Sequence, residues 1–325
     1  MIRVIIVGAG NIGSRHLQAL ANVNATLQIF VVDPSAQAIS ISEDRFREVP
    51  NSINHKFIGC GSIEDAPKEV DLAIISTSSG PRLDVIKELV STVKFNKLVL
   101  EKFLFTNEES FHIAKEIFSK NGIMVWVNTT RRAWDFYKKL KDYLMDAKYI
   151  SMFENGGEWG MACNAIHEFD VLSMLQGDHF EYTVDTSGIE NRLFESKRKG
   201  YIEFNGTIIF KSQKGTATIT SIPESDAPFI NCIYSDKGFF CIEESIDTCT
   251  YRIPKYGYEE RSCKMGIKPT STMMTEVYQE IIYTGRCDLP DYDSSMKLHL
   301  IYLRALLQKE NEITGNKENK ICQIT

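Results

Sequence analysis

The sequence predicts an α/β protein in which a doubly wound parallel sheet is followed by an α+β domain with a large, mostly antiparallel, open-faced sheet. Short β-branched runs alternate with amphipathic segments over the first part of the chain, as in successive βαβ units. Beyond about residue 130 the apolar runs pair around turn signals, as in antiparallel hairpins. The length of 325 residues suits two domains, which we place at residues 1–128 and 129–325.

The first element is a strand that opens onto a glycine-rich turn. Val4–Val7 is a β-branched run, and an amphipathic helix is expected from Ile12 onward. Between them, Gly8, Gly10 and Gly13 follow the GxGxxG spacing. In a dinucleotide-binding turn these glycines permit the sharp bend, the close approach of a pyrophosphate and tight packing of helix on strand. Glycines that serve turn geometry alone are the alternative.

The second strand supports dinucleotide binding. The run 27–32 ends in Asp33, about twenty residues after the glycines, where a carboxylate can accept hydrogen bonds from ribose hydroxyls. Asp33 can also cap the helix that follows. Because no Arg or Lys comes directly after it to receive a 2′-phosphate, NAD is favoured over NADP. These features predict a Rossmann domain.

The alternation of strands and helices continues to residue 128. Helices are expected at 35–49, 81–93 and 108–120, and strands at 55–59, 71–80, 97–103 and 123–128. Ligands of such a sheet bind beyond the carboxyl ends of its strands. The expected cofactor-binding residues are therefore Gly8, Gly10, Asn11, Ile12, Gly13, Asp33, Ser76, Thr77, Glu101, Lys102 and Asn128.

The second half of the chain has a different pattern. Helices are expected at 133–146 and 163–175, and two more close the chain. Hairpin-like runs cover 201–223 and 227–245, with turn signals at Asn205-Gly206 and Asp236-Lys237-Gly238. We expect the polar tail after Gly315 to fray.

Composition excludes several classes of protein. A net charge of −6 argues against a nucleic-acid surface. No apolar run approaches the ~20 residues of a membrane helix, and no secretory signal is evident. The 8 cysteines lack zinc-site spacing, so we expect reduced thiols in a cytoplasmic protein and no metal site.

Two groups of residues are candidates for chemistry. Lys102 lies at the end of the run 97–103, where a nicotinamide ring is expected, and a partly desolvated lysine can exchange a proton with a substrate hydroxyl. A solvated lysine paired with Glu101 is the alternative. On the helix at 163–175, Cys163, His167 and Asp170 share a face, with Asn164 on its flank. His167 is either a tuned acid/base or a buried structural histidine.

The motifs together resemble the glucose–fructose oxidoreductase/inositol dehydrogenase (Gfo/Idh/MocA) family over nearly the whole chain. The resemblance rests on "GAGNIGSRH" at 8–16, "IISTSSG" at 74–80, "LEKF" at 100–103, "NAIHEFD" at 164–170 and the segment 276–308. It implies a Rossmann domain followed by a large antiparallel sheet that often mediates oligomerisation. It also implies NAD or NADP chemistry on sugars, cyclitols or nucleotide-linked sugars, with Lys102 as the lysine of a Glu-Lys-Pro motif and His167 as the acid/base.

The chain departs from the family pattern at several positions. Phe103 replaces the motif's proline, and Arg82 stands where a histidine is common. Cys163 occupies the position of the usual catalytic aspartate, so either the neighbouring Asn164 orients the substrate hydroxyl or the chemistry is altered. Arg132, which with Arg131 follows the run 123–128, is either a partner for a substrate phosphate or carboxylate, or a solvated surface arginine.

We therefore expect an NAD-dependent oxidoreductase that transfers hydride at a secondary alcohol of a sugar, cyclitol or nucleotide-sugar. Lys102, His167 and Asn164 are the expected catalytic residues, and Arg132, Asn164 and Asp170 the expected substrate-binding residues. A non-catalytic sensor of NAD or sugar, and a lyase or epimerase that recycles bound NAD, are the alternatives. By analogy with the family we expect a homodimer or homotetramer.

Overall fold

The structure, a computed structural model, describes all 325 residues and forms two compact units. The first unit comprises residues 1–105, 109–133 and 268–293, and the second comprises 106–108, 134–267 and 294–325. Near its C-terminal end the chain therefore returns once to the first unit. None of the helices is both long and apolar enough to cross a membrane.

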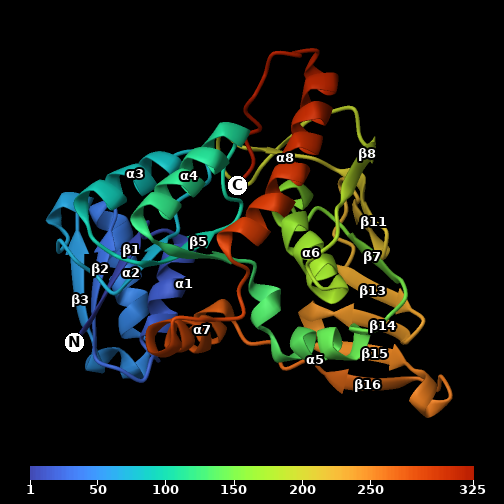
Figure 1. Cartoon of the computed structure of the whole chain (residues 1–325), viewed down its shortest axis with the longest axis horizontal. Helices are drawn as coiled ribbons and strands as arrows, with labels where there is room; N and C mark the ends of the chain where they lie inside the picture. Colours follow the sequence, from blue (N-terminus) through green and yellow to red (C-terminus); the bar gives the residue numbers. More distant parts are fainter. The chain divides into compact units, whose positions relative to one another are not determined.

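The first unit is built on a six-stranded parallel sheet (Figure 1). Its strands are β1 (Ile2–Val7), β2 (Leu27–Val32), β3 (Lys56–Cys60), β4 (Leu72–Ile75), β5 (Lys97–Glu101) and β6 (Met124–Asn128). The strand order is β3-β2-β1-β4-β5-β6, so the order reverses between β1 and β4. This is the doubly wound order of a Rossmann fold, and the predicted fold class of this part is confirmed.

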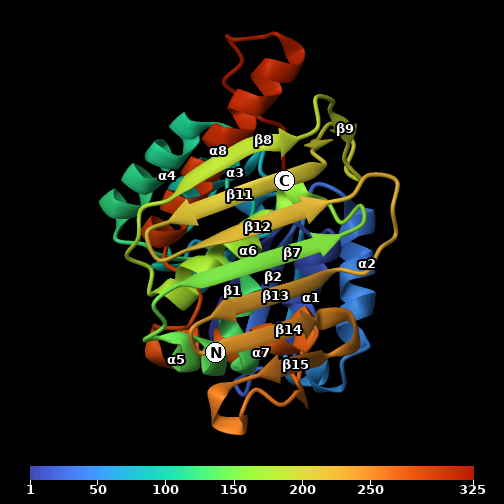
Figure 2. The same ribbon diagram turned by 90° about the vertical axis from the view of Figure 1, so that its right-hand side faces the viewer.

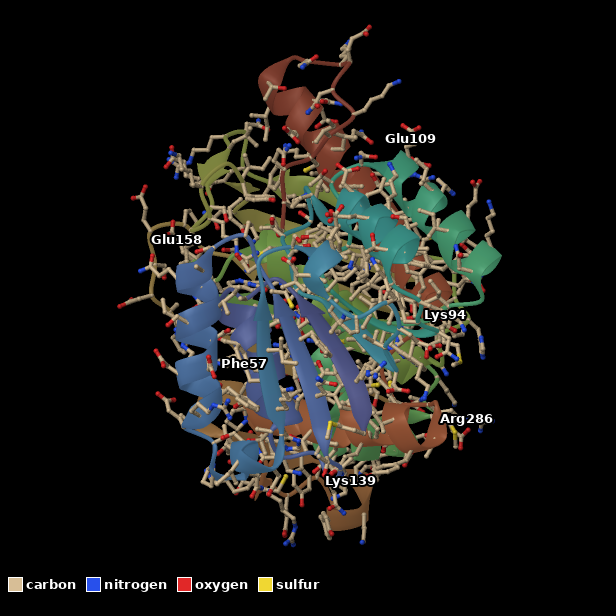
Figure 3. All side chains as sticks on the ribbon, turned by 90° about the vertical axis from the view of Figure 1, so that its left-hand side faces the viewer. Phe57, Lys94, Glu109, Lys139, Glu158 and Arg286 are labelled. Carbon is tan, nitrogen blue, oxygen red and sulfur yellow. The ribbon has the colours of Figure 1, made fainter.

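Helices cover both faces of this sheet. They are α1 (Asn11–Leu20), α2 (Ala36–Arg47), α3 (Arg82–Thr92), α4 (Glu108–Asn121) and α7 (Thr270–Thr284). Figure 1 shows α3 and α4 on one side of the strands and α1 and α7 on the other. Because both faces are covered, Val4, Ile5 and Ile6 of β1 are completely buried. At the sheet edge, Phe57 of β3 lies beside α2 and contacts Phe46 with ring centroids 6.1 Å apart (Figure 3).

The second unit is built on an eight-stranded sheet. Its strands are β7 (Ile150–Gly156), β8 (Thr183–Ile189), β11 (Gly206–Ser212), β12 (Gly215–Ser221), β13 (Ile230–Ser235), β14 (Gly238–Glu243), β15 (Thr248–Arg252) and β16 (Arg261–Lys264). The order is β16-β15-β14-β13-β7-β12-β11-β8, and only β7 with β12 pair in parallel. The predicted, mostly antiparallel sheet is confirmed. A separate two-stranded sheet joins β9 (Phe194–Glu195) and β10 (Ile202–Glu203).

Three helices cover one face of the large sheet. In Figure 2 the uncovered face is toward the viewer and the helices lie behind the strands. They are α5 (Asp135–Leu144), α6 (Met161–Gln176) and α8 (Tyr292–Thr314). Residues alternate between the two faces, and along β12 Ala217 and Ile219 are completely buried. Phe210 of β11 packs on Tyr302 of α8, with ring centroids 5.5 Å apart. This covered face is the core of the second unit.

Two local predictions need correction. Asn205-Gly206 separates β10 from β11, whereas the hairpin of β11 and β12 turns at 213–214; the turn at Asp236-Lys237 is confirmed. The tail does not fray at its end. Cys322 and Ile324 are completely buried, and the Ile202 amide donates to the Gln323 carbonyl at 2.7 Å. Apolar side chains and a backbone partner therefore hold a segment whose composition is polar.

Candidate cofactor and active site

The glycine turn between β1 and α1 has the geometry that a phosphate cradle requires. Gly8 has φ +103°, a conformation that favours glycine. A Cβ at Gly13 would lie 1.9 Å from the Gly8 carbonyl oxygen, so helix and turn are in direct contact. A Cβ at Gly10, by contrast, would meet nothing within 4 Å. Gly10 is the N-cap of α1, so the first-turn amides, which include those of Asn11 and Ile12, have no side-chain cap.

Asp33 and Ser76 stabilise this turn. The Ala9 amide donates to Asp33 Oδ2 at 2.8 Å, and the Ser35 amide donates to Asp33 Oδ1 at 2.9 Å. The N-cap of α2 is Ser35, whose Oγ accepts from the Ala38 amide at 3.2 Å, so Asp33 holds the capping residue and does not itself cap the helix. Ser76 Oγ donates to the Gly8 carbonyl at 2.8 Å. Ser76 supports the turn from β4, and direct contact of either side chain with a cofactor stays a prediction.

Polar atoms without a protein partner lie at the ends of β4 and β6, the two strands that flank β5. Thr77 Oγ1 follows β4, while Asn128 Oδ1 and Thr129 Oγ1 lie at the end of β6. All three atoms are buried and take part in no hydrogen bond within the protein. Buried polar atoms normally have partners. Together with the open space at Gly10, these atoms fit a dinucleotide that lies along the carboxyl edge of the sheet.

Glu101, at the end of β5, belongs to a buried network. His16 Nε2 of α1 lies 2.8 Å from Glu101 Oε1, and Asn128 Nδ2 donates to the same oxygen. Tyr278 of α7 places its hydroxyl 2.5 Å from His16 Nδ1. Burial, with a further contribution from the Glu101 charge, raises the pKa of Tyr278 well above its ordinary value. Tyr278 therefore keeps its hydroxyl proton, and His16 links this hydroxyl of α7 to the Glu101 carboxylate of β5.

The balance of effects keeps Glu101 ionised. Burial alone would raise the pKa of this carboxyl. The hydrogen bond and charge of His16, the hydrogen bond from Asn128 and the positive charge of Lys102 outweigh burial and lower the pKa below its ordinary value. A buried carboxylate with fixed partners thus precedes Lys102 in the chain.

Lys102 itself is half-buried, unlike the solvated surface lysine of the alternative interpretation. Phe103 follows it through a cis peptide bond and is completely buried. Arg82, the first residue of α3, lies against this segment, and its Nη1 donates to the carbonyls of Glu101 at 2.7 Å and Leu104 at 2.9 Å. The residues on both sides of Lys102 are therefore fixed by side chains from other elements.

The second unit carries the other predicted catalytic residues on α6. The helix begins after Gly160, which has φ +76°, and Glu203 Oε2 accepts from the Ala162 amide at 2.8 Å. Asn164 Nδ2 donates to the Trp159 carbonyl at 3.0 Å, which fixes its side chain beside the N-terminus of the helix. His167 is half-buried one turn later, on the same flank as Asn164.

The predicted substrate residues fall in different units. Asp170 of α6, in the second unit, is only 1% exposed. Arg132 lies in a 3₁₀ turn (Thr130–Ala133) that follows β6 in the first unit, and it is only 7% exposed. The interpretation of Arg132 as a solvated surface residue is therefore wrong. The convergence of Lys102 of the first unit with His167 of the second stays a prediction.

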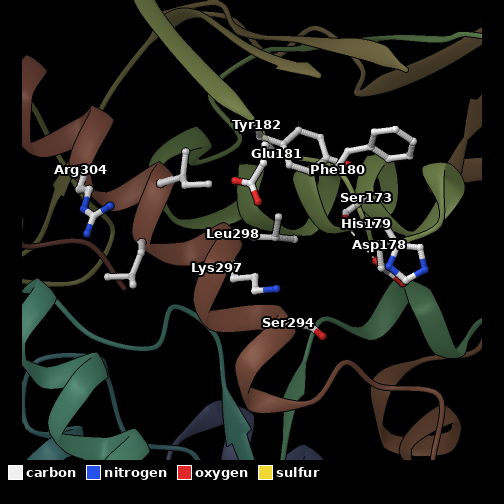
Figure 4. Close-up of a pocket in the computed structure, with 12 residues that line it drawn as sticks. Ser173, Asp178, His179, Phe180, Glu181, Tyr182, Ser294, Lys297, Leu298 and Arg304 are labelled. Carbon is white, nitrogen blue, oxygen red and sulfur yellow. Dashed lines mark hydrogen bonds between the residues drawn. The ribbon is translucent and has the colours of Figure 1, made fainter. Parts of the chain in front are cut away.

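A groove of about 420 Å³ lies elsewhere in the second unit (Figure 4). It runs between α8 and the segment that follows α6, and Figure 4 shows Glu181 and Lys297 on its two sides. None of the predicted site residues lines it. The groove lies at the C-terminal end of α6, whereas Asn164 lies in its first turns.

Sequence reasoning did not identify the buried residues that hold the site in the first unit: His16, Arg82 as a contact of the Lys102 segment, Thr129 and Tyr278. A weak signal was present for His16. It falls one turn after Gly13 and next to Leu17, on the face of α1 that packs inward, so a polar residue occupied a core position. For Arg82 the signal was its position, because it is the first residue of α3 and directly follows the loop after β4.

Comparison with known proteins agrees with this architecture. Residues 2–129 match the model of an oxidoreductase family with an NAD-binding Rossmann fold (Gfo/Idh/MocA). No curated protein sequence matches the chain.

Three solved structures illustrate the shared fold. UDP-N-acetylglucosamine 3-dehydrogenase GnnA from Acidithiobacillus ferrooxidans is 11% identical with a TM-score of 0.69, covering 94% of this chain and 96% of that one. A levoglucosan dehydrogenase, in complex with NADH and levoglucosan, is 12% identical with a TM-score of 0.72 and coverage of 96% and 98%. The transcriptional regulator Gal80p from Kluyveromyces lactis is 15% identical with a TM-score of 0.70 and coverage of 96% and 93%. The same fold thus carries both dehydrogenases and a regulator.

Proposed function

We propose that the chain is an NAD-dependent enzyme of the Gfo/Idh/MocA type, which transfers hydride at a secondary alcohol of a sugar, cyclitol or nucleotide-linked sugar. The match of residues 2–129 to the model of an oxidoreductase family with an NAD-binding Rossmann fold supports this proposal. One observation carries the proposal. Lys102 lies half-buried at the end of β5, directly after the fixed carboxylate of Glu101, on the sheet edge that also holds the glycine turn.

The first unit supplies the groups that would hold the dinucleotide. The uncapped amides of the first turn of α1 suit its phosphates. Asp33 suits the ribose hydroxyls, and the residues that follow it, Pro34 and Ser35, offer no positive charge to a 2′-phosphate. Thr77 and Asn128 offer their unpartnered oxygens farther along the edge. When bound, the nicotinamide supplies the hydride acceptor or donor.

Residues of this chain would move the proton and orient the substrate. During oxidation the hydroxyl proton passes to the imidazole of His167, or to Lys102 Nζ when this lysine is in its neutral amine form. Asn164, whose amide is fixed by the Trp159 carbonyl, orients the hydroxyl by a hydrogen bond. Arg132 and Asp170 bind other polar groups of the substrate. Holding the reacting carbon in line with the cofactor is the main contribution of the protein.

The test is the variant Lys102→Met. We expect turnover on the productive substrate of a sugar and nucleotide-sugar panel to fall at least ~10²-fold, with NAD affinity retained. Lys94→Met is the matched control, because Lys94 is 82% exposed and paired with Glu69. Turnover near the wild-type rate in Lys102→Met would remove Lys102 from the mechanism. Titration with NADH and NADPH decides the cofactor, and tighter NADPH binding would contradict the preference for NAD.

A second candidate, a non-catalytic sensor of NAD or a sugar, is favoured by Cys163. A thiol at this position cannot supply the negative charge of the family's aspartate, and its Sγ lies 3.4 Å from the Gly160 carbonyl. A sensor binds the dinucleotide without steady-state reduction on any substrate. A lyase or epimerase would instead be purified with nicotinamide absorbance and form product without net NADH. The absorbance spectrum followed by the turnover panel separates the three.

We also propose that the protein is a homodimer or homotetramer. The outer face of the large sheet presents Phe153 and Tyr234 at 43% and 48% exposure, near the middle of the sheet on β7 and β13. Apolar aromatic residues at the centre of an uncovered sheet face are typical of an interface between subunits.

A further inference from the structure

Arg82 is an arginine buried in an unusual environment. It is 1% exposed, and its guanidinium faces backbone carbonyls from two strand-to-helix connections. Nη1 donates to the carbonyls of Glu101 at 2.7 Å and Leu104 at 2.9 Å, and also to that of Phe103. Nη2 donates to the carbonyl of Thr77. One side chain thus connects the segment after β4 with the segment after β5.

These carbonyls need such a donor. Strand β5 ends at Glu101 and α4 begins at Glu108, so the segment between them takes part in neither a sheet nor a helix. It is nevertheless deep in the protein, since Phe103 and Leu104 are completely buried. Buried backbone carbonyls must find hydrogen-bond donors. Arg82 supplies them because a planar guanidinium carries five N–H groups in a fixed fork, which a lysine ammonium cannot reproduce.

We propose that Arg82 is a positioning residue for Lys102, an inference that rests on the proposed function. Two of the carbonyls that Arg82 binds belong to Glu101 and Phe103, the residues directly before and after Lys102. Fixing both neighbours fixes the backbone from which the lysine side chain starts. Arg82 therefore sets where the ammonium lies relative to the cofactor edge, without touching the substrate itself.

A positioning role and a purely structural role of Arg82 predict different effects when Arg82 is substituted. A positioning residue acts on kcat through geometry, and a displacement of about 1 Å can cost ~10²-fold in rate. The carbonyls to which Arg82 donates belong to Thr77 and to residues 101, 103 and 104, which follow β4 and end β5, so we expect kcat to change more than the affinity for dinucleotide. A residue that only supports the fold would instead loosen the whole unit.

The experiment compares Arg82→Lys and Arg82→Met with Lys87→Met. Lys87 lies on the same helix, 49% exposed and 3.6 Å from Asp84, and serves as the matched control. Three quantities are measured: amide hydrogen exchange by peptide, the rate of acetylation of Lys102 by an amine-reactive reagent, and kcat with KM. The first two need no substrate, so they decide the inference even if the wild-type protein turns over nothing on the panel, a result that would overturn only the proposed function.

We expect exchange in residues 102–105 to rise at least ~10-fold in both Arg82 variants, with β1 and β2 unchanged. The acetylation rate of Lys102 should change by a similar factor. The kcat should fall ~10²-fold in Arg82→Met and less in Arg82→Lys, with KM and NADH affinity within ~3-fold of wild type. Lys87→Met should match wild type throughout. Unchanged exchange and acetylation, or loss of protection across the whole unit in both variants, would overturn the inference.

Discussion

His16 Nε2 and Glu101 Oε1 lie 2.8 Å apart although the two residues are 85 positions apart in the sequence. His16 is on α1, the helix whose first turn follows Gly10, and Glu101 precedes Lys102. The pair therefore joins the helix of the cofactor cradle to the strand end that carries the proposed catalytic lysine. Both side chains are buried, at 0% and 10% exposure. A substitution of either residue should therefore affect both the stability of the first unit and the proposed site.

The first prediction concerns removal of the histidine. His16→Ala leaves the Glu101 carboxylate buried with one partner fewer, and breaking a buried pair in this way costs about 3 kcal/mol. Glu101→Gln removes the charge at nearly constant volume, so it should lower the free energy of unfolding by about 1 kcal/mol. Urea titration measures both. Arg47→Ala, which breaks an exposed pair with Glu43 at 3.1 Å, is the control and should change stability by less than about 0.5 kcal/mol. If His16→Ala lowered the free energy of unfolding by as little as Arg47→Ala does, the His16–Glu101 pair would not stabilise the protein.

The second prediction is a loss of stability in acid that depends on Glu101. Although burial opposes it, the hydrogen bond and charge of His16, with Asn128 and Lys102, lower the pKa of this carboxyl in the folded protein. An unfolded glutamate titrates near pH ~4.3. The stabilisation is therefore fully present above that pH and is lost as the pH falls through the lower pKa of the folded state.

Urea titrations between about pH 6 and pH 3 measure this effect. The difference in free energy of unfolding between wild type and Glu101→Gln should shrink as the pH falls. A difference that stays constant over this range would contradict the prediction.

The third prediction separates two glycines of the same turn. Gly13→Ala would place a Cβ 1.9 Å from the Gly8 carbonyl oxygen, and it should destabilise the protein by about 1–3 kcal/mol through overpacking. Gly10→Ala meets no atom within 4 Å at an ordinary φ of −67°, so stability should stay within about 0.5 kcal/mol.

The Gly10 methyl would project into the space assigned to the pyrophosphate, so NADH affinity should fall at least ~10-fold. Thermal unfolding measures the stability of the two variants, and a fluorescence titration measures their NADH affinity. Undiminished affinity in Gly10→Ala would exclude this turn as the phosphate site.

The sequence predicted those parts of the fold that depend on neighbours along the chain. The β1–α1 turn is an example, because the requirements of Gly8 and Gly13 are local and the strand-helix context is visible around them. The doubly wound order followed in the same way from the alternation of strands and helices.

What the sequence did not reveal depends on partners far along the chain. His16 has no assignable role until Tyr278, 262 residues later, places its hydroxyl on the imidazole. The acceptors of Arg82 are backbone carbonyls, which leave no mark in the amino-acid pattern. Likewise, the composition of the C-terminal tail gave no sign that the amide of Ile202 would donate to Gln323.

The last prediction tests the outer face of the large sheet as the contact between copies of this chain. Phe153 and Tyr234 lie on neighbouring strands with ring centroids 6.0 Å apart, and Phe239 extends the cluster at 4.5 Å from Tyr234. Burying such a cluster against a second copy removes apolar surface from water, which favours association. Tyr234→Asp would place a charge in that contact, and an unpaired buried charge is strongly unfavourable.

We therefore expect light scattering after size exclusion to give a dimer or tetramer for the wild type and a smaller assembly for Tyr234→Asp. Ile53→Asp is the control, since Ile53 is 85% exposed in the first unit and should leave the mass unchanged. A wild-type monomer at high concentration, or an assembly that Tyr234→Asp does not alter, would mean that this sheet face serves another purpose.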